Sequence, residues 1–219
     1  MKLTLFDLDH TLLAGDSDVL WCDYLMDAGL LDRAHFAPRN LQMEADYQAG
    51  TVDAADFADF YVSTLAGRTL SDLEPVRRDF LQRQVRPRIP RAARDLVEAH
   101  RRAGDLVVMT TATNRYITEL TAADFGIEHL IATEVETDGD RFTGRTRGLP
   151  NMREGKVTRL SAWLAQRGRA LDDYDSTAYS DSANDLPLLQ AVNRAVAVDP
   201  DPRLEAWARE NGWSVLRLR

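Results

Sequence analysis

Two aspartates, Asp7 and Asp9, follow an apolar run near the start of the chain, in the sequence KLTLFDLDHT. The run predicts a buried strand, and side chains two residues apart on a strand point to the same side. Two carboxylates this close repel each other and lose hydration unless a cation or strong donors lie between them. Capping of a following helix by Asp9 or Thr11 is the alternative, but it does not account for Asp7 inside the apolar run. We therefore expect a ligand site at the carboxyl end of this strand, where open α/β sheets bind ligands.

Three further stretches contain polar groups suited to a phosphate or a metal ion. Thr111 lies in VVMTTATN, at the predicted turn from a second strand into a helix, where a hydroxyl and backbone N–H groups bind anions. Lys156 lies at the start of a predicted helix, where the helix dipole disfavours it unless an anion is near. Asp181, Asn184 and Asp185 follow a short apolar strand in YSDSANDLPLL. Taken singly, these positions have plain alternatives: helix capping near Thr111, a solvated lysine at Lys156 and an N-terminal helix acid at Asp185.

Together these groups predict a phosphoryl-transfer site. Three carboxylates and a backbone carbonyl suit Mg²⁺, a hard cation that keeps several of its waters. A lysine, a threonine hydroxyl and helix N-terminal amides suit a phosphate. One further carboxylate, that of Asp9, is free for proton transfer. A site with a metal, a phosphate binder, a nucleophile and an acid/base group is equipped to transfer a phosphoryl group.

The elements that must position these residues fall into two parts. Four helical patterns follow the first strand without a strand between them. The first is capped by Ser17, the second covers 32–49 with an interruption at Pro38, and the third shows an apolar stripe over 57–65. The fourth is capped by Ser71, with Glu74 three residues later. The sequence RPRIP, at 86–90, is a helix breaker and marks a boundary.

Beyond that boundary, strands and helices alternate. Strands are expected at 105–110, 129–135, 177–180, 195–198 and 213–218, with a hairpin turn on Asp138 and Gly139. Helices are expected at 91–103, 114–125, 154–167, 185–192 and 202–210. This alternation predicts a parallel sheet with right-handed crossovers. We expect an α/β fold, with a Rossmann-like sheet domain of residues 1–15 and 88–219 and a helical insertion of residues 16–87.

The composition limits the classes of function. With 219 residues, of which 44% are hydrophobic, the chain can bury the core of one large domain with an insertion. A net charge of −8 would repel nucleic acid. No apolar run approaches the ~18 residues of a membrane span, the N-terminus lacks a signal-peptide pattern, and the single cysteine, Cys22, fits a reducing compartment. We expect a cytoplasmic protein without a nucleic-acid or membrane partner; the sequence does not indicate its oligomeric state.

The four motifs together resemble those of the haloacid dehalogenase superfamily of phosphatases. They are DLDHT at Asp7, the threonine at Thr111, the lysine at Lys156 and SDSANDLPLL at Asp181, and they occur in this order over nearly the whole chain. The helical insertion resembles the cap domain of the phosphoserine-phosphatase-like branch, subfamily IB. The stretches TATN and FTGR…EGKV are similar to the bacterial subfamily that includes histidinol-phosphate phosphatases.

The resemblance implies a role for each matching residue. Asp7 would be the nucleophile and form an aspartyl-phosphate, while Asp9 would protonate the leaving alcohol and then activate water. Mg²⁺ would be bound by Asp7, the backbone carbonyl of Asp9 and Asp181, with Asp185 as a water-mediated partner. The phosphate would be bound by the side chains and backbone amides of a second group of residues, namely Thr111, Lys156, Asn184, Leu8 and Ala112.

The substrate depends on the helical insertion. Phosphoserine phosphatases carry a Glu nine residues after the nucleophile for the substrate ammonium, and Asp16 occupies that position here. They also carry an Arg for the substrate carboxylate, but the matching stretch, VDAADFADFYVSTL, has no basic residue. From Asp16 to Pro75 there are twelve acidic and three basic residues, a net charge of −9, which suits either a cationic substrate or simple solubility. We expect a small phosphorylated metabolite, an amino-alcohol phosphate with histidinol phosphate first, and phosphoserine or a broad range of metabolites as alternatives.

A phospho-receiver signalling domain is the non-enzyme alternative. Such domains also place acidic residues, a Thr or Ser and a Lys around a phosphorylated Asp. They need about half this length and contain no helical insertion, so the segment from Asp16 to Pro87 argues against this class. We therefore expect an enzyme, a phosphoric monoester hydrolase.

Overall fold

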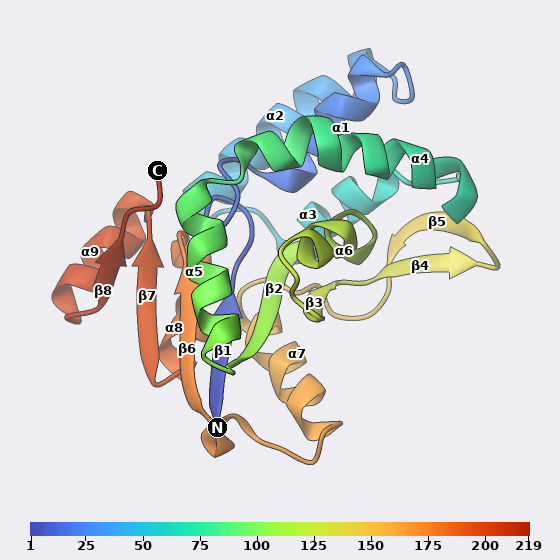
Figure 1. Ribbon diagram of the computed structural model, residues 1–219. Helices are drawn as coiled ribbons and strands as arrows, with labels where there is room; N and C mark the ends of the chain where they lie inside the picture. The colour runs from blue at the N-terminus through green and yellow to red at the C-terminus, as the bar shows by residue number, and fades with distance from the viewer.

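A six-stranded parallel sheet forms the centre of the molecule (Figure 1). The computed structural model describes residues 1–219. The strand order is β3-β2-β1-β6-β7-β8, and the strands are β1 (Lys2–Phe6), β2 (Leu106–Asn114), β3 (His129–Thr133), β6 (Asp175–Ser180), β7 (Arg194–Val198) and β8 (Ser214–Leu216). Within β1, Leu5 lies opposite Val108 of β2 and Ala178 of β6. The end of β1 is therefore flanked by the ends of the two strands that carry the other predicted motifs.

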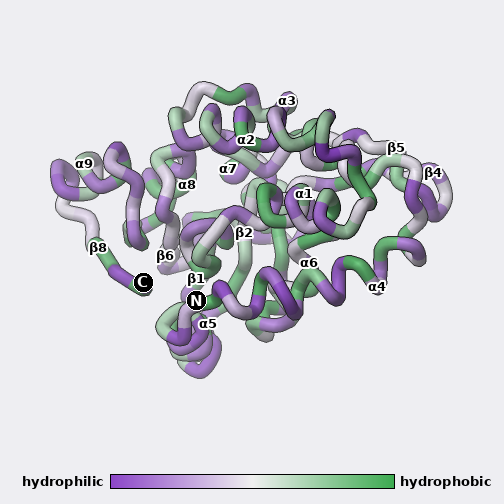
Figure 2. The backbone as a smooth tube through the Cα atoms, turned by 90° about the horizontal axis from the view of Figure 1, so that it is seen from above, coloured by the Kyte–Doolittle hydropathy of each residue, from purple (hydrophilic) through white to green (hydrophobic).

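Helices cover both faces of the sheet, because the crossovers between parallel strands run across it. Successive side chains of β1 point to opposite faces, so Leu3 and Leu5 pack on one side and Phe6 on the other. The face of Leu3 and Leu5 is covered by α7 (Glu154–Ala165), α8 (Leu186–Ala191) and α9 (Pro202–Glu210). The face of Phe6 is covered by α5 (Arg91–Arg102) and α6 (Arg115–Asp124). The view from above shows α9 and β8 at one end of the molecule and the β4–β5 hairpin at the other (Figure 2).

The segment between β1 and α5 is helical, as predicted. It contains α1 (Ser17–Asp27), α2 (Arg33–Ala49), α3 (Ala54–Ser63), α4 (Leu70–Phe80) and the short turns η1 (Leu81–Val85) and η2 (Arg86–Arg88). These helices lie beyond the carboxyl ends of the strands (Figure 1). Trp21 and Phe80 of the insertion share one buried cluster with Phe6 and Leu8 of the sheet domain. The division into residues 1–15 with 88–219 and residues 16–87 remains our proposal, because the two parts share this core.

Three local predictions in the insertion are wrong. Asp16, not Ser17, is the N-cap of α1, and Ser17 is the first helical residue. Pro38 does not interrupt α2, which runs through it. The N-cap of α4 is Thr69, which forms a capping box with Asp72. The predicted capping pair, Ser71 and Glu74, therefore lies two residues too late in the chain. Asp, Ser and Thr are all good N-caps, and the apolar pattern does not choose among neighbouring candidates.

The predicted hairpin joins the helical insertion. Its strands are β4 (Val135–Asp138) and β5 (Arg141–Thr146), so the turn lies one residue later than predicted, on Gly139 and Asp140. The backbone N–H of Gly67, after α3, donates to the carbonyl of Phe142 (2.9 Å). Gly144 adopts a φ of +81°, and a Cβ there would lie 2.6 Å from the Cβ of Ala66, so only glycine permits this close approach. None of the helices combines the length and apolar character needed to cross a membrane.

The free edge of β3 is closed by an ion-pair network around Glu134. Arg115 donates to Glu134 (2.8 Å) and to the carbonyl of Leu130 (3.0 Å), while Arg159 donates to Glu134 (3.1 Å) and to the carbonyl of Ala132 (2.8 Å). Partial burial opposes ionisation of Glu134, but the two guanidinium groups outweigh it and hold the pKa of its carboxyl below the usual range. The network occupies carbonyls that an exposed edge strand would otherwise offer to another chain.

Glu134→Gln is expected to lower the free energy of unfolding at neutral pH by about 1–3 kcal/mol, because its charge-assisted hydrogen bonds from Arg115 and Arg159 are weakened. The pKa of Glu134 is depressed in the folded state, so its contribution is present above the unfolded value of about 4.3 and is lost as the pH falls through the folded value. Denaturant titrations of parent and variant should therefore converge as the pH falls below the folded-state pKa of Glu134. Glu210→Gln, at an exposed position, is the control; a pH-independent difference for Glu134→Gln would contradict this account.

Candidate active site

The predicted motifs meet at the carboxyl edge of the sheet, around Lys156. The Nζ of Lys156 donates to Oδ1 of Asp7 (2.7 Å) and to Oδ2 of Asp185 (2.7 Å). All three side chains are buried. Burial alone would lower the pKa of Lys156, but the two carboxylates outweigh it and raise that pKa above the ordinary value. Lys156 is therefore a fixed positive charge beside Asp7, and not a solvated lysine.

The chain turns sharply after β1, and this turn brings Asp7 and Asp9 to the same end of the sheet. The N–H of Asp7 still donates to the carbonyl of Tyr179 in the neighbouring strand (3.0 Å). The carbonyl of Leu8 then accepts from the N–H groups of Thr11 (3.2 Å) and Leu12 (2.9 Å), which closes a tight loop. His10, inside this loop, has a φ of +55°, a conformation that non-glycine residues adopt only when their surroundings impose it.

Thr11 lies between two carboxylates, and its hydroxyl has only one proton to donate. Its Oγ1 is 3.1 Å from Oδ2 of Asp7 and 3.0 Å from Oδ1 of Asp181, and it also accepts from the N–H of Asp181 (3.0 Å). One hydroxyl can donate to only one of the two carboxylates. Burial raises the pKa of Asp7 to about 7 despite Lys156, and burial together with the charge of Asp7 raises the pKa of Asp181 well above its ordinary value. The space between these two carboxylates is therefore deficient in positive charge.

This donor set fits a magnesium ion. Asp7 and Asp181 offer carboxylate oxygens, and the backbone carbonyl of Asp9 is the further predicted ligand. No group of three or more His, Cys, Asp or Glu side chains is arranged to hold a metal ion by itself. Mg²⁺ is usually held by one or two carboxylates, several waters and phosphate oxygens, so an open set of this kind suits it. Oδ2 of Asp185 accepts from Lys156 and from the hydroxyl of Ser180 (2.7 Å), and its water-mediated role toward a metal stays a prediction.

Asp9 is oriented by three donors. Its Oδ2 accepts from the hydroxyls of Thr111 (3.1 Å) and Thr113 (2.9 Å), and its Oδ1 accepts from the N–H of Ser17 (2.7 Å). The sequence predicts Thr111 as a phosphate ligand, and in this structure its hydroxyl is directed at Asp9. The same three donors hold the Asp9 carboxyl beside the nucleophile candidate, at the junction of the sheet and the helical insertion.

Asn151 is a site residue that no sequence feature indicates. Its Nδ2 lies within hydrogen-bond distance of the Oγ1 of Thr110 (3.0 Å) and the carbonyls of Thr111 (2.9 Å) and Ile131 (3.0 Å). Its N–H donates to the hydroxyl of Thr133 (3.0 Å), which in turn donates to the carbonyl of Ala112 (2.6 Å). Asn151 thus ties the ends of β2 and β3 together and fixes the peptides of the predicted phosphate loop. An isolated asparagine between two predicted elements carries no distinguishing pattern.

Asp16 and Asp18 form a buried acidic pair at the start of α1. Oδ1 of Asp16 accepts from the N–H groups of Asp18 (2.9 Å) and Val19 (3.0 Å), and the other oxygen is not used by the helix cap. Burial, followed by the charge of Asp9, raises the pKa of Asp16 to about 8. Burial and the neighbouring Asp16 also raise the pKa of Asp18 well above its ordinary value. The insertion therefore offers a second place where a positive charge would be stabilised.

Asn184, the remaining predicted ligand, is turned toward the insertion. Its Nδ2 donates to the carbonyl of Tyr47 in α2 (3.1 Å). Asp7, Thr111, Lys156 and Asp181 are each at most 9% exposed, so the insertion closes over the site. A cavity of about 300 Å³ lies beside it, lined by His10, Tyr47, Gln48, Asp181, Ser182, Asp199, Asp201, Pro202 and Arg219.

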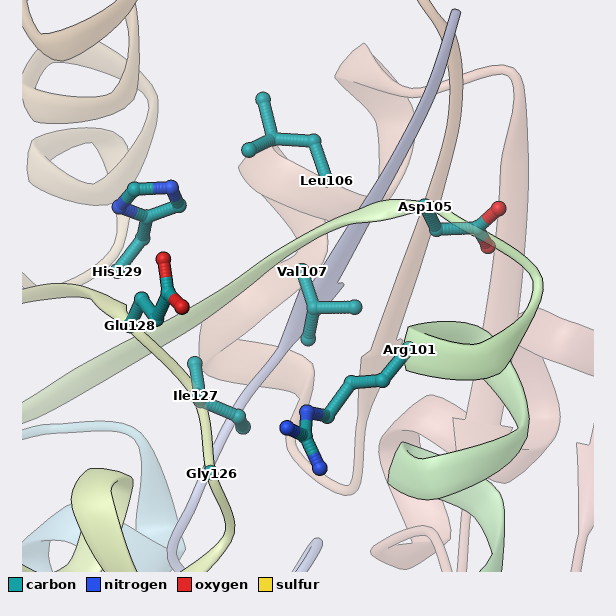
Figure 3. A pocket seen from close by; sticks show the side chains of 8 residues that line it. All are labelled: Arg101, Asp105, Leu106, Val107, Gly126, Ile127, Glu128 and His129. Carbon is teal, nitrogen blue, oxygen red and sulfur yellow. The ribbon is translucent and has the colours of Figure 1, made fainter.

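A second cavity of about 300 Å³ lies at the opposite end of the strands. Its lining includes Asp105 and Leu106, which precede and begin β2, and His129, which begins β3 (Figure 3). The guanidinium of Arg101 packs against Gly126, which also lines this cavity. A Cβ on Gly126 would lie 2.8 Å from Cζ of Arg101. Because Asp7 lies at the carboxyl end of the sheet, this cavity takes no part in the candidate active site.

The fold and the residues gathered around Lys156 define a hydrolase of the haloacid dehalogenase type. Residues 4–190 match the family model for haloacid dehalogenase-like hydrolases, and the chain belongs to this family. It is an enzyme of the phosphatase kind, and the signalling-domain alternative is set aside.

Three comparisons place it more closely. The chain is 42% identical to a histidinol-phosphatase of Neisseria meningitidis serogroup C, over 100% of this chain and 99% of the relative. It is 32% identical to a phosphoserine phosphatase of Mycobacterium tuberculosis, over 98% of this chain and 70% of the relative. A crystal structure of a Bordetella pertussis protein of unknown function matches with a TM-score of 0.94 and 43% identity, over 100% of this chain and 99% of that chain.

Lys156→Met is expected to lower the free energy of unfolding by about 3–5 kcal/mol, because it leaves Asp7 and Asp185 buried without their counter-charge. Adding Asp185→Asn to Lys156→Met should restore part of this loss, since one of the two uncompensated carboxylates is removed. Denaturant titration measures both effects. Lys2→Met is the matched control, because Lys2 is the only other lysine and is exposed. Equal stability of parent and Lys156→Met would show that the lysine does not balance the buried acids.

Proposed function

We propose that this protein is a Mg²⁺-dependent phosphomonoesterase that acts through an aspartyl-phosphate on Asp7, and that its substrate is a small amino-alcohol phosphate, histidinol phosphate first. The observation that carries the proposal is the position of Asp7, buried between the ammonium of Lys156 (2.7 Å) and the hydroxyl of Thr11 (3.1 Å). One oxygen of this carboxylate contacts a cation, and the other contacts the Thr11 hydroxyl, which also contacts the metal-binding candidate Asp181.

The proposed reaction has two halves that use the same two carboxylates. Oδ1 of Asp7, beside Lys156, attacks phosphorus, and the bond from phosphorus to the alcohol oxygen breaks as the new bond forms. Asp9 gives its proton to the departing oxygen. In the second half, Asp9 takes a proton from a water molecule, whose oxygen attacks the phosphorus and releases phosphate from Asp7. The hydroxyl of Thr113 and the backbone N–H of Ser17 keep the Asp9 carboxyl in place for both transfers, while the Thr111 hydroxyl turns to the phosphate.

The remaining residues would bind the phosphate and its charge. Lys156, the Thr111 hydroxyl and the backbone N–H groups of Leu8 and Ala112 are the proposed phosphate donors, with Asn184 on the far side. When bound by Asp7, Asp181 and the carbonyl of Asp9, Mg²⁺ supplies the positive charge that offsets repulsion between the carboxylate and the phosphate dianion.

The choice of substrate rests on the acidic pair of the insertion and on the names of two similar proteins. Asp16 and Asp18 are buried without a basic partner, and a substrate with a cationic organic group would provide one. The relative with 42% identity over the full length is named a histidinol-phosphatase, which supports histidinol phosphate and a place in amino-acid biosynthesis. Phosphoserine is the alternative, supported by the relative with 32% identity. We place the reaction in the cytoplasm, with the single buried cysteine, Cys22, as support.

Asp7→Asn is expected to abolish turnover while leaving the protein folded, because an amide oxygen is a poor nucleophile and the substitution conserves volume. Steady-state release of inorganic phosphate measures the rate, and circular dichroism checks the fold. In the parent enzyme, rapid acid quenching followed by mass spectrometry should detect phosphate on the peptide that contains Asp7. Undiminished turnover by Asp7→Asn would remove the aspartyl-phosphate from the mechanism.

A panel of phosphomonoesters tests the substrate. With Mg²⁺, kcat/KM should be highest for histidinol phosphate and lower for phosphoserine, whose carboxylate would meet the acidic insertion. A chelator should abolish activity on every ester, and added Mg²⁺ should restore it.

Asp16→Asn should reduce kcat/KM for histidinol phosphate by about tenfold, the equivalent of one charge-assisted contact. The same variant should change kcat/KM by much less for an ester whose alcohol part carries no charge, such as p-nitrophenyl phosphate. A parent enzyme that prefers phosphoserine would overturn the choice of substrate.

A further inference from the structure

The carboxyl end of α2 is held by side chains of the sheet domain. Asn184 donates to the carbonyl of Tyr47 (3.1 Å), Arg153 donates through Nη2 to the carbonyl of Gly50 (2.9 Å), and Arg203 donates to the carbonyl of Ala49 (3.4 Å). The last carbonyls of a helix have no partner of their own inside the helix, and the negative end of its dipole favours cations. These contacts join two parts of the chain more than a hundred residues apart.

Arg153 is held in an unusual backbone conformation. Its φ and ψ are 52° and −124°, a region that a residue with a side chain adopts only when its surroundings impose it. Arg153 directly precedes α7, the helix that carries Lys156. Its Nε also donates to Oδ1 of Asn184 (3.4 Å). Both ends of the Asn184 amide are thus engaged, one by α2 and one by Arg153.

The hydrogen bonds that hold the end of α2 affect access to the site. Tyr47 belongs to the last turns of α2, and it lines one cavity together with Asp181. The ring of Tyr47 packs against that of Phe57 in α3, at a centroid distance of 5.1 Å. Asp7 is only 6% exposed, and the end of α2 lines the cavity beside Asp181, so movement of this end would widen the way to Asp7.

We propose that Arg153 is a positioning residue that, together with Asn184, forms a latch on the last carbonyls of α2, and that this latch opens to admit each substrate and closes over it. The inference deepens the proposed function, on which its kinetic part rests. The latch ties closure to the catalytic residues, because Asn184 lies in the same motif as Asp181 and Asp185, and Arg153 lies in the turn before Lys156. Substrate held under the closed latch escapes when the latch opens, so a loosened latch speeds its dissociation and lowers the apparent affinity.

Hydrogen–deuterium exchange of the full-length, substrate-free protein tests the latch without reference to activity. Arg153→Gly removes the guanidinium and relieves the backbone conformation, so the variant should fold, and the amides of residues 45–50 should exchange about tenfold faster, as expected for the loss of a charge-assisted hydrogen bond. Arg153→Lys, which keeps the charge but loses the fork, should give a smaller increase. Arg203→Ala is the matched control: it removes an exposed arginine with one longer contact and none to Asn184, and should change exchange by less than about twofold. Exchange in Arg153→Gly equal to that of the parent would overturn the proposal.

Steady-state kinetics separates positioning from a merely structural role. For histidinol phosphate with Mg²⁺, Arg153→Gly should raise KM by about tenfold, because loss of a charge-assisted hydrogen bond lets bound substrate escape more often, with kcat changed by less than about threefold. Arg153→Lys should recover part of the KM. A fall in kcat with an unchanged KM would overturn the positioning role. If the parent hydrolyses no phosphomonoester, the proposed function fails, while the exchange experiment still decides whether the latch exists.

Discussion

Lys156 is the only basic side chain buried in the molecule, and it shares that interior with five buried aspartates: Asp7, Asp16, Asp18, Asp181 and Asp185. One ammonium cannot balance five carboxylates, and in a medium of low polarity the remaining groups are either protonated or in need of a cation. Lys156 binds the first and the last of the five and leaves the other three without a charged partner. Buried carboxylates without a positively charged partner therefore lie in two separate places in the structure.

Those two places correspond to the two ends of the proposed substrate complex. The gap between Asp7 and Asp181 matches a divalent cation and the phosphate attached to it. The pair at the start of α1 matches an organic cation some distance from the phosphorus. A neutral or anionic alcohol would leave the second place unsatisfied, so the charge distribution, and not only the shape of the insertion, would select among phosphate esters.

The sequence predicted the sheet and the meeting of its strand ends because parallel topology allows few other outcomes. Once strands and helices alternate, Asp7, Thr111 and Asp181 must lie at one edge, whatever the details of the loops. It did not predict which hydroxyl contacts which carboxylate, nor the part of Asn151. Those contacts depend on loop geometry that no periodicity records. The helix starts at Asp16 and Thr69 were missed for a related reason: several acceptable caps stand side by side, and their free energies differ by a few tenths of a kcal/mol.

The buried cluster that joins Trp21 and Phe80 to Phe6 determines how the insertion can move. Helices α1 and η1 are anchored in that shared core, and displacing them would expose large aromatic surfaces to water. Helix α3 is held separately by the β4–β5 hairpin, since Asp59 accepts from the hydroxyl of Thr146 (2.8 Å). Helix α2 packs instead on a smaller apolar cluster that contains residues of α1 and α3 together with Met152. Of the helices of the insertion, α2 is therefore the one whose displacement would expose the least of the core shared with the sheet domain.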